Sequence, residues 1–552
     1  MLPIVLGFAA SSARSEDAAL LTVAEQSGFR ATARYAEVVA LLDRLAEKSP
    51  LAQRISLGTS GEGRALPVLA LSDPPVATPE EAQALAQRRE KLIVMAIGNI
   101  HGGEVCGKEA LPMLAREIVT TPDHPLLRDL IILLAPIYNA DGNERVALDN
   151  RSYQDGPELG MGERVNAAGL DLNRDFIKLE APETRALVGF LSRWDPAVFI
   201  DTHTTNGSFH RYLITYDGPK TPGGAPLLIE FARRDLFPAL TRRCRERGVE
   251  TYYYGNFEGD HARWTSFPAT ARFGTSYVGL RGRLGILSEA YSYAPYERRV
   301  RGTLEFVRAC FEYAAANKTR IARLLADADA QTTAAGMNPR ADDRVGLRFD
   351  ARAETEKVVV AGYVEQPKEE DEPELARGGS SAGDARPRGP TTRPRREWQR
   401  TISTATVRDY QVELWRDFHA TRSAPRPYAY LVPSELTGVL ENLRLHGVRS
   451  EPLPQEREAE VEVYRIDAAA FAEREFQKHR LATLEVTPRV ERRRLPAGTV
   501  VVPTGQPLGN LVAYLLEPAC EDGLAAWNFL DAHLEVGAEY PILRAPRAFG
   551  DE

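Results

Sequence analysis

The first stretch of this 552-residue chain that could bind a metal is LIVMAIGNIHGGE at residues 92–104. In it, His101 and Glu104 follow an apolar run that stops at Gly98. An imidazole and a carboxylate just past a buried strand can turn toward one point in space and hold a metal there. Catalytic zinc takes three protein ligands, two histidines and a glutamate being one such set, and keeps a further position for water. A second histidine is therefore required, because H-x-x-E alone also fits a solvated pair in the first turn of a helix.

Two later strands end in further polar groups. The apolar run 198–201 leads directly to His203, and the run 284–287 leads to Glu289. Ligands of open α/β sheets bind outside the carboxyl ends of the strands. We therefore expect His101, His203 and Glu289 to lie together at one edge of a sheet.

The elements that must position these groups alternate between strands and helices. Continuous apolar runs at 92–98 and 130–137 are typical of strands buried on both faces. Helical patterns lie at 35–48 and 106–119. This alternation predicts an α/β fold with a mixed, largely buried sheet flanked by helices. Short strand and helix patterns after residue 400 indicate a smaller α+β or β-rich C-terminal domain.

Composition is that of an ordinary soluble globular protein, with 43% hydrophobic and 26% charged residues. A net charge of -8 supports no general role in binding nucleic acid, and no apolar run approaches the length that spans a bilayer. The four cysteines are scattered without C-x-x-C spacing, so neither a structural zinc site nor a disulfide framework is indicated. We expect Cys106 to be a small buried hydrophobe.

The chain is long enough for about two to four domains. Residues 1–17 resemble a secretory signal peptide that lacks its basic start, which predicts export to a periplasmic or extracellular location. The alternatives are a disordered or packed terminus and a cytoplasmic protein. The remaining segments are a catalytic domain at 18–330, a connecting segment at 331–365, a disordered charged insertion or linker at 366–400, and a C-terminal domain of unknown function at 401–552.

Six stretches, taken together, resemble the M14 zinc carboxypeptidases. They are GTSGEGR at 58–64, HGGE at 101–104, NADG at 139–142, DLNRDF at 171–176, DTHTT at 201–205 and SEAYSY at 288–293. Their order and spacing agree with the family over about the first 320 residues, and the layout is closest to the regulatory and bacterial branches. The resemblance implies a zinc carboxypeptidase-like fold.

The resemblance also implies a metal and a base. One zinc ion per chain would be bound by His101, Glu104 and His203, and Glu289 would be the general base. The chemistry agrees, because zinc acidifies water and polarises a carbonyl, while a carboxylate can carry the released proton to the leaving amine. The alternative for Glu289 is a buried ion pair with Arg281 or Arg283.

Three more positions match substrate-binding motifs of the family. Asn173 and Arg174 stand where the family grips the terminal carboxylate of its substrate, a task that suits the planar fork of arginine. Arg164 stands where the regulatory branch stabilises the oxyanion. The alternative for Asn173 is a turn residue, and the alternative for Arg174 is a surface charge. The family's tyrosine that closes over the substrate stays unassigned, because several candidates lie between His203 and Glu289, among them Tyr254 and Tyr277. The preferred side chain of the substrate also stays open.

Three functions fit these residues. The leading one is a zinc metallocarboxypeptidase that acts on peptides or proteins with a free C-terminus. The second is a zinc amidase or cell-wall peptidase that uses the same centre. The third is a non-catalytic peptide-binding protein of the same fold.

Overall fold

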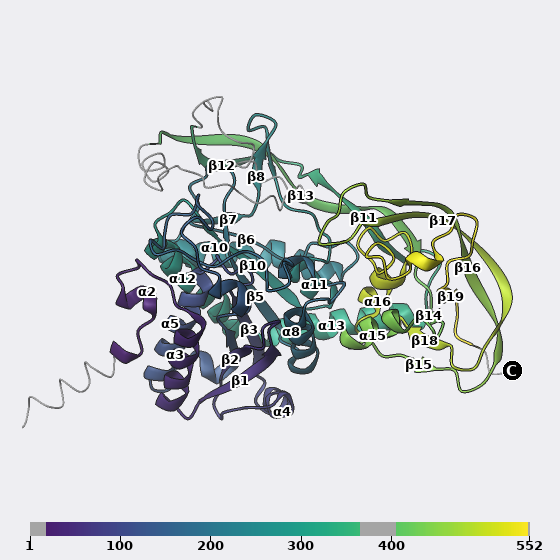
Figure 1. Cartoon of the computed structure of the whole chain (residues 1–552), viewed down its shortest axis with the longest axis horizontal. Coiled ribbons are helices and arrows are strands. Elements are labelled where there is room, and N and C mark those ends of the chain that lie inside the picture. Colours follow the sequence, from purple (N-terminus) through teal and green to yellow (C-terminus); the bar gives the residue numbers. More distant parts are fainter. Residues whose placement is uncertain (1–17, 365–404, 550–552) are drawn as a thin grey trace, which may run out of the picture.

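The computed structural model describes residues 18–364 and 405–549 and is drawn in Figure 1. Its largest sheet has eight strands in the order β1-β2-β4-β3-β5-β10-β6-β7. Strands β4, β3, β5 and β10 are parallel, whereas β1-β2, β2-β4 and β10-β6 are antiparallel. The predicted α/β fold with a mixed sheet is confirmed. The signal-like segment 1–17 and the charged insertion 366–400 lie outside the described residues.

The strands of this sheet are almost wholly buried at its centre. Every residue of β3 and β4 is buried, so helices and loops cover both faces, as the continuous apolar runs predicted. The bounds are β1 Ala52–Thr59, β2 Ala65–Leu71, β3 Leu92–Gly98, β4 Leu130–Ala135, β5 Val198–Thr205, β6 Ile214–Asp217, β7 Thr251–Tyr253 and β10 Leu284–Tyr291.

The first long helix of the chain buries one apolar stripe. In α3, Tyr35–Lys48, the buried residues recur at helical spacing and are Val38, Leu41, Leu42 and Leu45. The other long helices of this half are α5 Cys106–Thr120, α8 Pro182–Trp194, α12 Tyr296–Ala316 and α13 Lys318–Met337. The others are α2 Val23–Gln26, α4 Pro79–Arg89, α6 Leu126–Asp129, α7 Ala140–Glu144, α9 Pro226–Phe231, α10 Phe237–Glu246, α11 Gly274–Leu280, the 3-10 helix Leu172–Arg174 and the π-helix Ala232–Leu236.

Strands β5 and β10 are longer than the sequence predicted. We expected them to end at residues 201 and 287, but they run to Thr205 and Tyr291. Their polar ends continue as strands because they pair with each other in parallel register, with His203 opposite Glu289. His203 and Glu289 therefore lie inside strands, and His101 lies beyond the end of one.

Two further sheets contain the strands that follow residue 340. One has the order β11-β13-β9-β8, with β12 also paired to β13, so the long β13 joins the hairpin that follows β7. In Figure 1, β13 runs across the top of the molecule. The bounds are β8 Asn256–Glu258, β9 Arg263–Thr265, β11 Arg344–Ala353, β12 Val358–Tyr363 and β13 Val407–Pro425.

The third sheet has six strands in the order β15-β18-β14-β19-β16-β17 and forms the β-rich C-terminal part (Figure 1). Its elements are β14 Ala429–Val432, α15 Thr437–Leu445, β15 Glu451–Pro452, β16 Arg457–Phe471, β17 Ala482–Leu495, β18 Val500–Pro503, α16 Gly509–Leu516, the turn Asp531–His533 and β19 Leu543–Ala545. Residue 330 lies inside α13, and the domain limits stay predictions.

Within residues 18–364 and 405–549, no helix combines the length and the apolar character that crossing a bilayer requires.

Candidate functional site

The loop between β3 and α5 is shaped by Asn99. This residue has a left-handed backbone, with φ of 66°. Its side-chain amide donates to the carbonyl oxygens of His101 at 3.3 Å, Gly102 at 3.0 Å and Glu104 at 3.4 Å. One side chain therefore holds the whole HGGE segment in a compact turn.

The two glycines of HGGE are required by close approach of other segments. A Cβ atom at Gly102 would lie 2.4 Å from the carbonyl oxygen of Glu163, and one at Gly103 would lie 2.6 Å from Cδ of Arg151. Both separations are well inside van der Waals contact, so any other residue would push these segments away from the loop.

His101, Glu104 and His203 converge. Nδ1 of His101 lies 2.9 Å from Oε1 of Glu104, and Nδ1 of His203 lies 3.0 Å from Oε2 of the same carboxylate. One possible ligand atom from each residue lies within 4.8 Å of the others, and all three side chains are buried. These donor atoms are of the kinds and number that a catalytic zinc site uses.

Each histidine has a carboxylate behind it. Nε2 of His101 lies 3.0 Å from Oδ1 of Asp171, and Nε2 of His203 lies 3.0 Å from Oδ2 of Asp201. Burial tends to raise the pKa of Asp171, but Arg164 and Arg174 hold it well below its usual range, so this carboxylate is charged. A carboxylate at one ring nitrogen turns the other toward the common point, which is a frequent arrangement for metal-binding histidines.

Glu289 lies beside the ligand set because β10 is the neighbour of β5. Its Oε2 atom is buried and has no hydrogen-bond partner within the described residues. Burial raises the pKa of the Glu289 carboxyl to about 8, because the charged form is disfavoured away from water. The carboxyl group is thus free of structural partners at that oxygen and can take up a proton near neutral pH.

The alternative role for Glu289, an ion pair with a nearby arginine, is not what the structure contains. Arg283 pairs with Asp195 at 2.7 Å and with Asp329 at 2.9 Å. Arg281 donates instead to Ser192 Oγ at 3.1 Å and to the carbonyl oxygen of His446 at 2.8 Å. Both guanidinium groups are engaged elsewhere.

Arg164 lies at the rim of the ligand set. It donates to Oδ2 of Asp171 from Nε at 3.0 Å and from Nη2 at 2.7 Å, and its Nη1 atom lies 3.8 Å from Oε1 of Glu104. The side chain is 42% exposed. A charged group fixed on one side and open on the other can meet a ligand that enters from solvent.

Asn173 and Arg174 occupy a short helical turn directly after Asp171. The side-chain oxygen of Asn173 accepts from the backbone N–H of Gly274 at 2.8 Å, so its NH₂ group faces the other way. The guanidinium of Arg174 lies 4.4 Å over the ring of Phe273. Burial lowers the pKa of Arg174 to about 10, which still leaves it charged at neutral pH.

Comparison with known proteins agrees with this geometry. Residues 38–222 match the model of the zinc carboxypeptidase family, peptidase M14. This segment is similar to the M14 zinc carboxypeptidases. The family match and the relatives named below indicate that the chain is a peptidase of the metallocarboxypeptidase class.

Similar carboxypeptidases are known from fungi and animals. Carboxypeptidase 2 of Trichophyton tonsurans is 24% identical over 88% of this chain and 81% of its own length. Carboxypeptidase Z of Mus musculus is 37% identical over 26% of this chain and 21% of its own length. Among solved structures, carboxypeptidase A of Helicoverpa armigera covers 55% of this chain and 81% of its own, with 17% identity and a TM-score of 0.37.

One residue of this candidate site was not predicted. Arg151 lies in the segment that the sequence indicated only as a loop, yet its Nη1 atom is 2.9 Å from Oε1 of Glu104. Its Nη2 atom donates to the carbonyl oxygen of Thr204 at 2.6 Å, and the side chain is buried. The only signal in the sequence is Gly103, whose missing side chain leaves the space that Arg151 fills.

Two of the tyrosines left open by the sequence, Tyr254 and Tyr277, have different surroundings. Tyr277 is fully buried, and its hydroxyl is bound to Nδ1 of His446 at 2.8 Å. Burial and the Glu289 carboxylate raise the pKa of Tyr254 to about 12, while Arg174 opposes the shift. Tyr254 therefore lies close to Glu289 and Arg174 of the candidate site, whereas Tyr277 belongs to the core.

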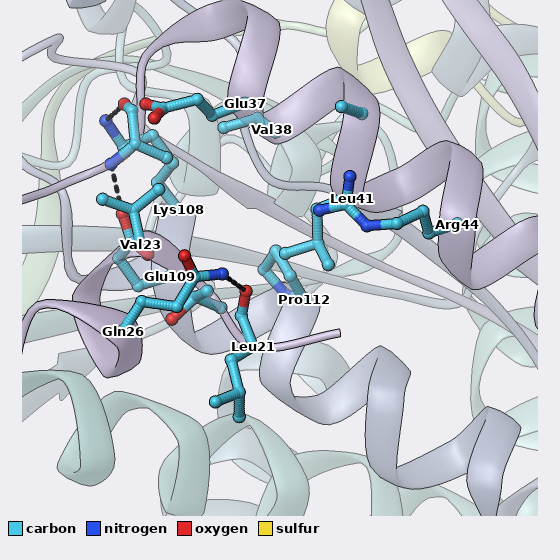
Figure 2. Close-up of a pocket in the computed structure, with 13 residues that line it drawn as sticks. Leu21, Val23, Gln26, Glu37, Val38, Leu41, Arg44, Lys108, Glu109 and Pro112 are labelled. Carbon is cyan, nitrogen blue, oxygen red and sulfur yellow. Dashed lines mark hydrogen bonds between the residues drawn. The ribbon is translucent and has the colours of Figure 1, made fainter. Parts of the chain in front are cut away.

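A separate cavity of about 230 Å³ lies between α2, α3 and α5 (Figure 2). Lys108 at its wall donates to Asn143 and to the carbonyl oxygen of Ala33, and the Glu109 carboxylate accepts from Thr32 and Ala33. These charged groups hold the segment before α3. No predicted site residue lines this cavity.

The prediction for Cys106 is confirmed. All four cysteines are free and buried, and burial raises the pKa of Cys106, so none has the features of a nucleophile.

Proposed function

We propose that this chain is a zinc-dependent carboxypeptidase that removes the C-terminal residue of peptides or proteins. The observation that carries the proposal is the convergence of His101, Glu104 and His203 beside a buried oxygen of Glu289 that has no hydrogen-bond partner in the described part of the chain. Two histidines and a carboxylate would hold the metal, and the glutamate on the next strand would handle protons.

The donor set fits zinc. Both imidazoles face the Glu104 carboxylate through Nδ1, and Asp171 and Asp201 support them from behind. When bound, zinc would supply Lewis-acid polarisation of the scissile carbonyl and would acidify a water molecule. Burial lowers the pKa of His203, but the facing Asp201 carboxylate outweighs this and raises the pKa well above its usual value. Metal binding at this histidine is therefore expected to release a proton.

Replacing Asp201 by asparagine is expected to lower zinc affinity by about 10- to 100-fold, because the carboxylate that orients His203 loses its charge. Competition with a chelator would measure this. The matched control is Asp260→Asn, whose side chain is fully exposed and which should keep the affinity of the unmodified protein. A folded Asp201→Asn variant with unchanged affinity would contradict the assigned role.

The chain's own residues supply the proton transfer. Glu289 would accept a proton from the attacking water at Oε2 and deliver it to the nitrogen of the leaving residue. A pKa raised by burial suits a group that must take up and release a proton near neutral pH. Arg164, open to solvent at the rim, would stabilise the negative oxygen, and Tyr254 would close over the substrate.

Asn173 and Arg174 would select a free C-terminus. The charged guanidinium of Arg174 lies over the ring of Phe273, and its planar fork would donate to the substrate carboxylate. The amide of Asn173 would donate to the same group through its NH₂. A carboxylate satisfies both donors at once. This pair is the feature that separates an exopeptidase from a general amidase.

Replacing Arg174 by alanine is expected to raise KM for free-acid peptides by about 30-fold or more, because a charged hydrogen bond is lost from a site poor in water. Amidated peptides of the same sequence should be little affected. Kinetics on matched free-acid and amide peptides would decide it, with Arg323→Ala, an exposed arginine on α13, as the control.

The same assay separates the alternatives. If the unmodified protein cleaves free-acid and amide peptides equally well, the amidase or cell-wall peptidase function replaces the exopeptidase one. If it binds peptides but contains no zinc and shows no turnover, the non-catalytic alternative holds. Export stays a prediction that depends on residues 1–17, which lie outside the described residues.

A further inference from the structure

A tight turn of the C-terminal part reaches the segment that carries the substrate-binding pair. Phe476 and His479, between β16 and β17, exchange backbone hydrogen bonds of 2.8 and 3.0 Å. The two residues at the tip, Gln477 and Lys478, have φ of 52° and 67°. Two successive left-handed residues are typical of the type I′ turn, but glycine, asparagine and aspartate are the residues usually found there. The tip thus carries long polar side chains where small residues are usual.

Those side chains bind one segment of the catalytic half. The side-chain oxygen of Gln477 accepts from the backbone N–H of Asp171 at 2.8 Å. Lys478 Nζ donates to the carbonyl oxygen of Ala168 at 2.6 Å, and Nε2 of the next residue, His479, lies 2.8 Å from Oε1 of Glu180. Three consecutive residues therefore hold the segment 168–180 at three points.

The central contact is made at the residue that connects the metal centre to the carboxylate-binding pair. The Asp171 side chain faces His101 at 3.0 Å and Arg164 at 2.7 Å. Its Oδ1 atom also accepts from the backbone N–H of Asn173, at the start of the turn that carries Arg174. The backbone of Asp171 therefore sets the position of both halves of the site.

The C-terminal part also contacts the residue next to Phe273, on whose ring Arg174 lies. Arg272 lies over the rings of Phe476 and Trp527, at 5.2 and 5.0 Å, and its backbone N–H donates to Asp522 at 2.7 Å. The next residue, Phe273, is the ring on which Arg174 lies. The segment before Arg174 and the ring on which Arg174 lies are thus both held by residues that follow position 470.

We propose that the turn 476–479 forms part of the substrate site and that Gln477 is a positioning residue. By accepting from the Asp171 N–H, Gln477 sets the orientation in which Asp171 faces His101 and in which the next turn presents Asn173 and Arg174. This inference rests on the proposed carboxypeptidase function. It assigns a role to the C-terminal part, which completes the catalytic half instead of acting alone.

The test compares Gln477→Met, which keeps the length of the side chain but removes the acceptor, with Gln477→Glu, which restores an acceptor oxygen. Arg474→Ala, on an exposed residue next to the turn, is the matched control. All variants are made in the full chain, and their melting temperatures are compared. Amide hydrogen exchange of Asp171, zinc affinity, and kcat and KM on free-acid peptides are then measured.

In Gln477→Met we expect Asp171 exchange to be about 10-fold faster, because a buried N–H loses its acceptor. KM for free-acid peptides should rise by a similar factor or zinc affinity should fall, with kcat changed less than KM. Gln477→Glu should recover part of each effect, and Arg474→Ala should match the unmodified protein. If Gln477→Met does not fold, Lys478→Met, which removes the contact to Ala168, is measured in the same way.

Unchanged exchange at Asp171 in a folded Gln477→Met variant would overturn the inference. Faster exchange with unchanged KM and unchanged zinc affinity would also overturn it, because the contact would then be structural only. If the unmodified protein has no peptidase activity, the proposed function fails separately. Exchange and zinc affinity would still decide whether Gln477 positions the site.

Discussion

Replacing Glu289 by glutamine is expected to lower kcat by about 100- to 10,000-fold, while the protein keeps its fold and its metal. The amide has the shape of the carboxyl group but cannot accept a proton from the attacking water. The structure supports this role through the register of β5 and β10, which sets Glu289 opposite His203, and through the buried Oε2 atom. Steady-state kinetics, zinc content and thermal unfolding would be measured on the same preparation.

The control for this variant is Glu473→Gln, an exposed glutamate outside the site, which should leave kcat unchanged. Glu289 is not a metal ligand in this proposal, so zinc content separates a lost base from a lost metal. Substantial residual kcat in Glu289→Gln, with zinc bound, would mean that another group takes up the proton.

Replacing His203 by alanine is expected to abolish stoichiometric zinc binding and with it the peptidase activity. In the described part of the chain three protein ligands converge here, so loss of one leaves a site with too few donors for a tightly held catalytic ion. The loss of affinity should exceed the about 10- to 100-fold expected when a supporting carboxylate is changed. Metal analysis after dialysis would report about one zinc per chain in the unmodified protein and little in the variant.

The comparison for His203→Ala is His533→Ala, which removes an exposed histidine from a short turn of the C-terminal part. That variant should keep its zinc and its activity. Full zinc occupancy in a folded His203→Ala variant would show that the metal is held by other residues.

The local elements and the family were predictable from the sequence. The helix at 35–48 was predicted with the bounds it has, because its buried residues recur at helical spacing. The apolar runs that became β3 and β4 predicted a sheet buried on both faces. The motif set predicted membership of the M14 family, since it combines residue types with the spacing that the chemistry needs.

The ends of the catalytic strands were predicted too early. His203 and Glu289 are polar, and a period-based prediction ends a buried strand at such residues. In the structure they stay in the sheet because each strand supplies the hydrogen-bonding partner of the other, 86 residues away. A local sequence pattern cannot predict the pairing of two strands that are far apart in the chain.

Several residues near the ligand set could be placed only by the tertiary structure. Arg151 reaches Glu104 from a segment of mixed composition, and only three-dimensional surroundings distinguish Tyr254 from Tyr277. The contact between Gln477 and Asp171 spans 306 positions. Local sequence determined which side chains have the chemistry of a zinc carboxypeptidase, because that depends on residue type and short spacing. Long-range packing decided which side chains hold them in place, because such contacts form only when distant segments meet in the folded chain.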